Sequence, residues 1–125
     1  MADQKATILC VDDESVPLTF RKFVLEKSGF HVLTAASGNE ALQRIRGEHV
    51  DLVLTDLLMP GISGTELARE IKRQQPELPI VLLSGVNEIP EDATRADFFL
   101  SKLEGPVAMC HKISEILNGT GKAVP

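Results

Sequence analysis

The sequence predicts a single α/β domain built on a parallel sheet, and three observations carry this prediction. Short runs of Val, Ile and Leu alternate five times with amphipathic segments. The first, third and fourth runs are almost continuously apolar, which is typical of strands covered by helices on both faces. The chain has 125 residues, the usual size of one domain, and contains no linker, internal repeat or low-complexity tract.

Five segments are predicted to be strands, and four amphipathic segments are predicted to be helices. The strands cover residues 6–11, 30–35, 50–55, 80–84 and 98–101. Ser15 is expected to cap the first helix, whose apolar face is predicted from the spacing of Phe20, Phe23 and Val24. Two capping boxes, residues 37–40 and 63–66, open the second and third helices.

The region between the fourth and fifth strands carries the weakest pattern. Residues 85–96 include Pro90 and several charged side chains, and they predict at most one short helix near residues 91–95. A last helix follows Gly105 and Pro106, with apolar positions up to Leu117. We therefore expect one domain over residues 1–125, with a core from about 7 to 117 and a flexible tail over 118–125.

Composition and charge argue against several classes of protein. The net charge is -5, which disfavours direct binding to nucleic acid or to an anionic membrane surface. No apolar run approaches the roughly 18 residues of a membrane-spanning helix, and the N-terminus does not resemble a signal peptide. Cys10 and Cys110 lie far apart in apolar settings, so we expect free thiols in a reducing cytoplasm.

Charged and hydroxyl side chains stand at the carboxyl ends of four predicted strands. Asp12 and Asp13 follow the first strand, Asp56 the third, Ser84 closes the fourth and Lys102 follows the fifth. Sites in open parallel sheets form at this edge, near the point where the strand order reverses. The sequence therefore predicts one cleft that contains three carboxylates, a hydroxyl and an ammonium group.

Three carboxylates in one cleft require compensation. Two like charges about 4 Å apart repel by roughly 4 kcal/mol at an effective dielectric constant near 20. Either one carboxylate keeps its proton or a cation lies between them, and an all-oxygen set suits Mg²⁺. Such parts fit phosphoryl transfer onto a carboxylate. The ordinary alternative is an acidic first helical turn after Asp12, a simple turn after Asp56 and a solvated Lys102.

At these residues the chain resembles the receiver domain of two-component response regulators. The resemblance runs from about residue 7 to 117, and its strongest stretches are residues 8–14 and 51–64, ILCVDDE and DLVLTDLLMPGISG. It implies a flavodoxin-like sheet, five parallel strands in the order 2-1-3-4-5 with helices on both sides. It also implies a phosphoacceptor that assists its own phosphorylation and dephosphorylation, rather than an enzyme.

The resemblance assigns expected roles by position. Asp56 corresponds to the phosphoacceptor, and Asp13 and Asp12 to the acidic pair at the Mg²⁺ ion. The backbone carbonyl of Leu58 is expected to reach the same metal. Lys102 is expected to neutralise the phosphoryl group, and Ser84 to contact it. Phe99 corresponds to the aromatic switch position. The implied donor is a sensor histidine kinase, and the implied output is an unknown downstream protein or a further phosphotransfer.

Two departures from the family pattern leave alternatives open. Lys102 is followed by Leu103, where the family has proline, and only 18 positions separate Ser84 from Lys102. The fourth helix is therefore expected to be short or irregular. The peptide bond between Lys102 and Leu103 is expected to be trans, with a differently shaped loop that could shift Lys102. One alternative is a module with the receiver fold that binds partners without phosphorylation. Another is a hydrolase with an aspartyl-phosphate intermediate, although Leu58 stands where such enzymes commonly have an acid.

Overall fold

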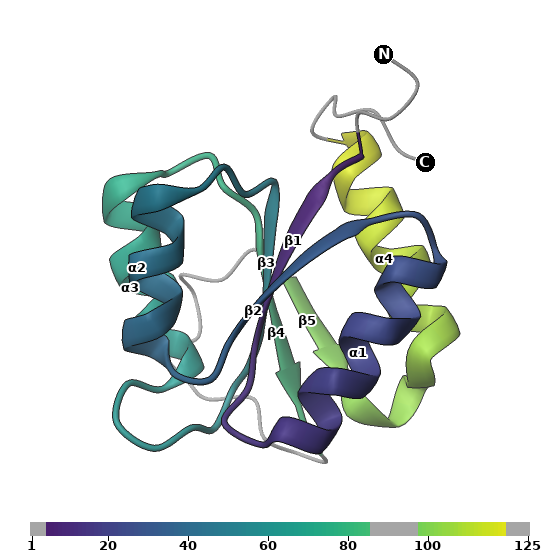
Figure 1. The fold of residues 1–125 in the computed structure, drawn as a ribbon, viewed down its shortest axis with the longest axis horizontal. Helices are drawn as coiled ribbons and strands as arrows, with labels where there is room; N and C mark the ends of the chain where they lie inside the picture. Colours follow the sequence, from purple (N-terminus) through teal and green to yellow (C-terminus); the bar gives the residue numbers. More distant parts are fainter. Residues whose placement is uncertain (1–4, 86–97, 120–125) are drawn as a thin grey trace.

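The computed structural model describes residues 5–85 and 98–119, which form one parallel sheet between two layers of helices (Figure 1). The strand order is β2-β1-β3-β4-β5, so the predicted 2-1-3-4-5 arrangement is confirmed. The strands are β1 (Thr7–Val11), β2 (His31–Ala35), β3 (Leu52–Asp56), β4 (Ile80–Ser84) and β5 (Phe98–Ser101). The helices are α1 (Ser15–Lys27), α2 (Gly38–Gly47), α3 (Gly64–Gln74), the short 3-10 helix η2 (Lys102–Glu104) and α4 (Gly105–Gly119).

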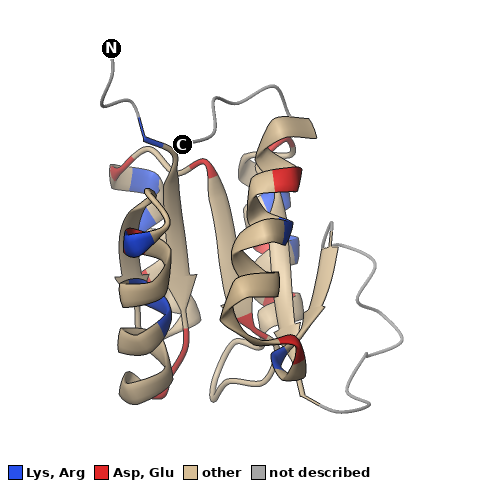
Figure 2. Cartoon of the chain, turned by 90° about the vertical axis from the view of Figure 1, so that its right-hand side faces the viewer, with Lys and Arg blue, Asp and Glu red and all other residues tan. Residues whose placement is uncertain are grey.

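The strands alternate between two apolar layers because neighbouring residues of a strand point to opposite faces. In β1, Ile8 and Cys10 belong to the core beneath α1 and α4, whereas Leu9 and Val11 belong to the core beneath α2 and α3. Every residue of β3 and β4 is buried, as expected for strands covered on both faces. Because the central strands are buried, charged residues lie mainly on the helices and at the strand ends (Figure 2).

Helix starts agree with the predicted caps in two of three cases. Ser63 and Glu66 form a complete capping box at α3. At α2 the Ser37 side chain accepts a hydrogen bond from the Glu40 backbone N, but the Glu40 carboxylate accepts from Ala36. The prediction for Ser15 is wrong, because it is already the first residue of α1 and its neighbour Glu14 occupies the cap position.

The predicted apolar face of α1 is confirmed at Val24, which packs against the core, and is wrong at Phe20 and Phe23. Phe20 and Phe23 are 54% and 57% exposed, while Leu25 is fully buried. The residue one helical turn before Leu25 is Arg21, whose side chain is 12% exposed. The helix therefore directs a cation towards the sheet.

Several expectations concern segments outside the described residues. The irregular region after Gly85 and the tail beyond Gly119 fall largely there. Within the described residues, no helix has the length and apolar character needed to cross a membrane. Cys10 and Cys110 are both free thiols, as expected.

Candidate functional site

Three carboxylates meet at the carboxyl edge of the sheet, as the sequence predicts. β1 and β3 are hydrogen-bonded neighbours, so Asp12 and Asp13 after β1 lie beside Asp56 at the end of β3. One carboxylate oxygen from each residue lies within 4.8 Å of the others. Asp12 and Asp56 are buried and Asp13 is exposed, so the cluster opens to solvent on the side of Asp13.

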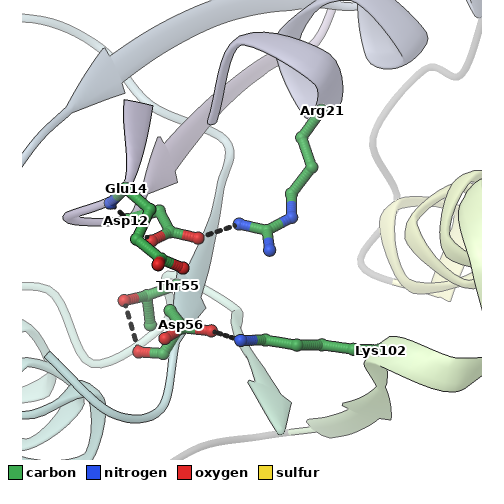
Figure 3. Close-up of polar contacts among 6 residues, drawn as sticks. All are labelled: Asp12, Glu14, Arg21, Thr55, Asp56 and Lys102. Carbon is green, nitrogen blue, oxygen red and sulfur yellow. Dashed lines mark hydrogen bonds and ion pairs between the residues drawn. The ribbon is translucent and has the colours of Figure 1, made fainter. Parts of the chain in front are cut away.

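Lys102 reaches this cluster from the end of β5. Its ammonium Nζ lies 2.5 Å from Oδ1 of Asp56 (Figure 3). The expected trans peptide bond after Lys102 is confirmed, since no cis peptide bond occurs among the described residues, and Lys102 still reaches Asp56. Within those residues, Oδ1 of Asp56 accepts no hydrogen bond of regular geometry, so the ion pair with Lys102 is its close polar contact.

The surroundings of Asp56 make its charged form costly. Burial raises the pKa of the Asp56 carboxyl above its ordinary value, and the neighbouring charge of Asp12 raises it further. Lys102 and, more weakly, Arg21 offset part of this rise in pKa by attraction. Asp56 is thus a desolvated carboxylate next to a cation. In such an environment a carboxylate oxygen of Asp56 retains its capacity to bind an electrophile or a metal ion.

Arg21 is a site residue that the sequence analysis missed. Its Nη1 donates to Oδ2 of Asp12 at 2.6 Å, while the backbone N of Glu14 donates to Oδ1 of Asp12 at 2.9 Å (Figure 3). This ion pair explains why α1 directs Arg21 towards the sheet. The signal in the sequence was a basic residue one turn before the buried Leu25, on a helix that starts directly after the acidic run.

The remaining predicted site residues lie at or near this edge of the sheet, and Phe99 lies further back within β5, opposite Leu82. Ser84 is buried at the end of β4 and lies opposite Ser101 in the β4–β5 register. Phe99 is half-buried and packs against Leu57 and Leu82 on the opposite face from Phe98. The side chain of Leu58, two residues beyond Asp56, is 59% exposed.

The loop after β3 approaches the site closely because Gly64 carries no side chain. A Cβ atom at Gly64 would lie 2.4 Å from the carbonyl oxygen of Asp56 and 3.0 Å from Cα of Leu57. The Gly64 backbone N also donates to the Leu57 carbonyl at 2.8 Å. Glycine at this position therefore lets the start of α3 lie directly against the end of β3, which fixes the backbone of Asp56.

The donor set suits a hard divalent cation. The oxygens of Asp12, Asp13 and Asp56 are the ligands that Mg²⁺ prefers, and the exposed side of the cluster leaves room for the waters that it retains. The buried Asp56 Oδ1 without a regular hydrogen bond has unused capacity as an acceptor. The residues present therefore fit a site for a divalent metal ion.

Comparison with known proteins decides the family. Residues 8–114 match the family model described as the response regulator receiver domain. This chain belongs to the response regulator receiver family. The receiver is 31% identical over 122 residues to the alkaline phosphatase synthesis transcriptional regulatory protein PhoP of Bacillus subtilis, covering 94% of this chain and 51% of the relative. It is also 37% identical over 91 residues to the transcriptional regulatory protein GlrR of Escherichia coli, covering 73% of this chain and 20% of GlrR. The receiver thus spans about half, or less, of these relatives.

Solved receiver structures share its fold over nearly the full length. A response regulator receiver domain from Clostridium thermocellum has a TM-score of 0.85 at 34% identity, covering 93% of this receiver and 97% of that chain. The response regulator TrrA from Thermotoga maritima, solved in complex with Mg²⁺ and BeF, has a TM-score of 0.84 at 32% identity, with 90% and 99% covered. The family is a phosphoacceptor switch that binds Mg²⁺ in its acidic pocket.

Proposed function

We propose that this receiver accepts a phosphoryl group on Asp56 in a reaction that depends on Mg²⁺. The observation that carries the proposal is the placement of Asp56: a buried carboxylate with two further carboxylates beside it and the Lys102 ammonium 2.5 Å away. A carboxylate of purely structural function has no need of two further carboxylates beside it, because like charges at this distance repel one another.

The chemistry follows from these contacts. A carboxylate oxygen of Asp56 attacks the phosphorus of the donor, the new phosphorus–oxygen bond forms in line with the bond that breaks, and an acyl phosphate results. With a phosphohistidine donor, the phosphorus–nitrogen bond breaks and the imidazole leaves with the electron pair. Lys102 then pairs with the negative charge of the transferred group and no longer with the Asp56 carboxylate. Asp12, Asp13, Asp56 and the backbone carbonyl of Leu58 would hold Mg²⁺ here, and the ion would supply positive charge next to the phosphoryl group.

Ser84 and Phe99 would convert this event into a change of surface. The Ser84 hydroxyl is buried at the neighbouring strand end, within the same edge of the sheet, and would donate to a phosphoryl oxygen on Asp56. Phe99 is only half-buried against Leu57 and Leu82, so its ring has room to change position when Ser84 moves. The protein then acts as a two-state switch for a partner protein or as an intermediate that passes the phosphoryl group on.

The partners follow from the family. We propose a sensor histidine kinase as donor and a downstream protein as recipient of the signal, with residues 7–117 as the receiver core. The setting would be the cytoplasm, which agrees with the two free thiols of Cys10 and Cys110. The binding module that works without phosphorylation is the weaker alternative, because the contact between Lys102 and Asp56 is in place despite Leu103.

A phosphorylation assay with a small phosphodonor tests the proposal. Incubation with acetyl phosphate and Mg²⁺ should give an adduct that mass spectrometry detects and that hydroxylamine removes. Asp56→Asn should abolish the adduct completely, because the amide is not a nucleophile. Asp51→Asn, at the other end of β3, is the matched control and should retain it. An adduct that persists in Asp56→Asn would remove Asp56 from its proposed role.

A further inference from the structure

Both oxygens of Asp12 are bound by the protein itself. Arg21 Nη1 lies 2.6 Å from Oδ2, and the Glu14 backbone N lies 2.9 Å from Oδ1. Asp12 is 1% exposed and the Arg21 side chain 12% exposed. Salt screens a buried pair much less than an exposed one, so the guanidinium charge acts on the whole cluster.

Arg21 and Lys102 enclose the three carboxylates from different elements. Arg21 reaches Asp12 from α1, and Lys102 reaches Asp56 from the end of β5 (Figure 3). Three carboxylates and two cations leave the cluster with a formal charge of 3 − 2 = 1 negative unit. Without Arg21 the negative excess would be two units, and the attraction for a divalent cation would increase accordingly.

We propose that Arg21 is a positioning residue that competes with the divalent cation for Asp12 and thereby sets the Mg²⁺ affinity of the site. The inference rests on the proposed Mg²⁺ site and names its regulation. In the metal-free protein Arg21 holds the Asp12 carboxylate and supplies part of the positive charge that the metal later provides. When the metal binds, the hold of Arg21 on Asp12 weakens, because the two cations repel one another at this distance.

The structure provides a place for the displaced guanidinium. Arg21 lines a groove of about 190 Å³ between α1 and the start of α4, together with Phe20, Ser101, Lys102 and Met109. The side chain can therefore leave Asp12 without unpacking the core. Thermodynamic coupling is reciprocal. The free energy by which bound metal weakens the contact between Arg21 and Asp12 therefore equals the free energy by which that contact weakens metal binding.

Metal titration of charge variants tests the inference. Isothermal titration calorimetry with MgCl₂ should show that Arg21→Gln, which keeps a donor and loses the charge, binds Mg²⁺ about five- to tenfold more tightly than the wild type. Arg21→Lys restores the charge and should return the affinity towards the wild-type value. Lys22→Gln removes a neighbouring exposed charge on α1, which pairs with Glu26, and should leave the affinity unchanged.

Thermal unfolding separates this role from a purely structural one. Arg21→Gln should melt at a lower temperature than the wild type without metal, because buried Asp12 loses its charged partner. Its melting temperature should also rise more steeply with added Mg²⁺. A structural role alone predicts only the first effect and unchanged metal affinity, and that outcome would overturn the inference.

A measurement on the wild type covers the case in which Arg21→Gln fails to fold. The Arg21 side-chain NMR resonance should move during Mg²⁺ titration and reach the exchange behaviour of an exposed arginine at saturation. A resonance that stays protected at saturation contradicts the inference while leaving the proposed function intact. If the wild type binds no Mg²⁺ at all, the proposed function fails together with it, and the two failures are thus distinguishable.

Discussion

Asp51 and Asp56 are buried at opposite ends of strand β3, and different groups surround the two carboxylates. Asp51 directly precedes β3, is 8% exposed, and accepts the Thr7 backbone N at Oδ2 and His49 Nε2 at Oδ1, both at 2.8 Å. Asp56 ends β3, is 5% exposed, and has an oxygen without a regular hydrogen bond. Burial therefore does not distinguish the two carboxylates, whereas their partners do, because nitrogens of Thr7 and His49 hold Asp51 and an ammonium group and two carboxylates surround Asp56.

The carboxylates at the two ends of β3 have different kinds of partner. At the amino edge, the Asp51 backbone N also donates to the Thr7 carbonyl at 2.8 Å, so side chain and backbone together join β3 to β1. At the carboxyl edge, Asp56 faces cations and like charges in place of such a brace. Asp51 therefore joins two strands at one edge of the sheet, whereas Asp56 belongs to a cluster of charges at the other.

The largest expected effect is an opposite change of stability at the two ends. Asp51→Asn replaces an acceptor of two hydrogen bonds and should lower the free energy of unfolding by about 1–3 kcal/mol. Asp56→Asn removes a desolvated charge from a cluster of like charges and should raise it. Urea denaturation of the two variants measures both changes. Destabilisation by Asp56→Asn would show that the pair with Lys102 outweighs the cost of burial.

The pH dependence of that gain sharpens the comparison. Because burial raises the pKa of Asp56 in the folded protein above the ordinary 3.8, the folded state binds the proton more tightly than the unfolded chain. Asp56 therefore favours folding below pH 3.8, and this contribution is lost as the pH rises through the raised value. The gain from Asp56→Asn should be full at neutral pH and vanish near pH 3.8. Denaturation curves at several pH values, compared with the wild type, measure it; a gain independent of pH would contradict this origin.

The smallest expected effect concerns His49, the more exposed partner of Asp51. The His49 side chain is 73% exposed, so its pair with Asp51 is well solvated. His49→Gln should change the free energy of unfolding by about 0.5 kcal/mol or less, because exposed pairs contribute little. The same denaturation experiment measures it. If His49→Gln lowered the free energy of unfolding as much as Asp51→Asn does, the His49 imidazole rather than the Thr7 backbone would be the stabilising partner of Asp51.

Some of these features were open to prediction from local sequence alone. The apolar runs and the capping box of Ser63 and Glu66 act between near neighbours, and the structure agrees with them. The prediction that Ser15 caps α1 failed because Glu14, held through its backbone N by Asp12, takes that position. The predicted apolar face of α1 failed at Phe20 and Phe23, which are exposed, whereas Val24 packs against the core and Arg21 pairs with the buried Asp12.

The sequence by itself determined the α/β class, the strand positions and the set of acidic residues at the strand ends, because periodicity and strand polarity are local properties. The tertiary structure decided which charges meet. It placed Arg21 on Asp12 and Lys102 on Asp56, contacts that span 9 and 46 positions of the chain. It also joined Asp51 to β1 and surrounded Asp56 with charged side chains. Such contacts depend on packing between elements, and burial then sets the cost of every charge they bring together.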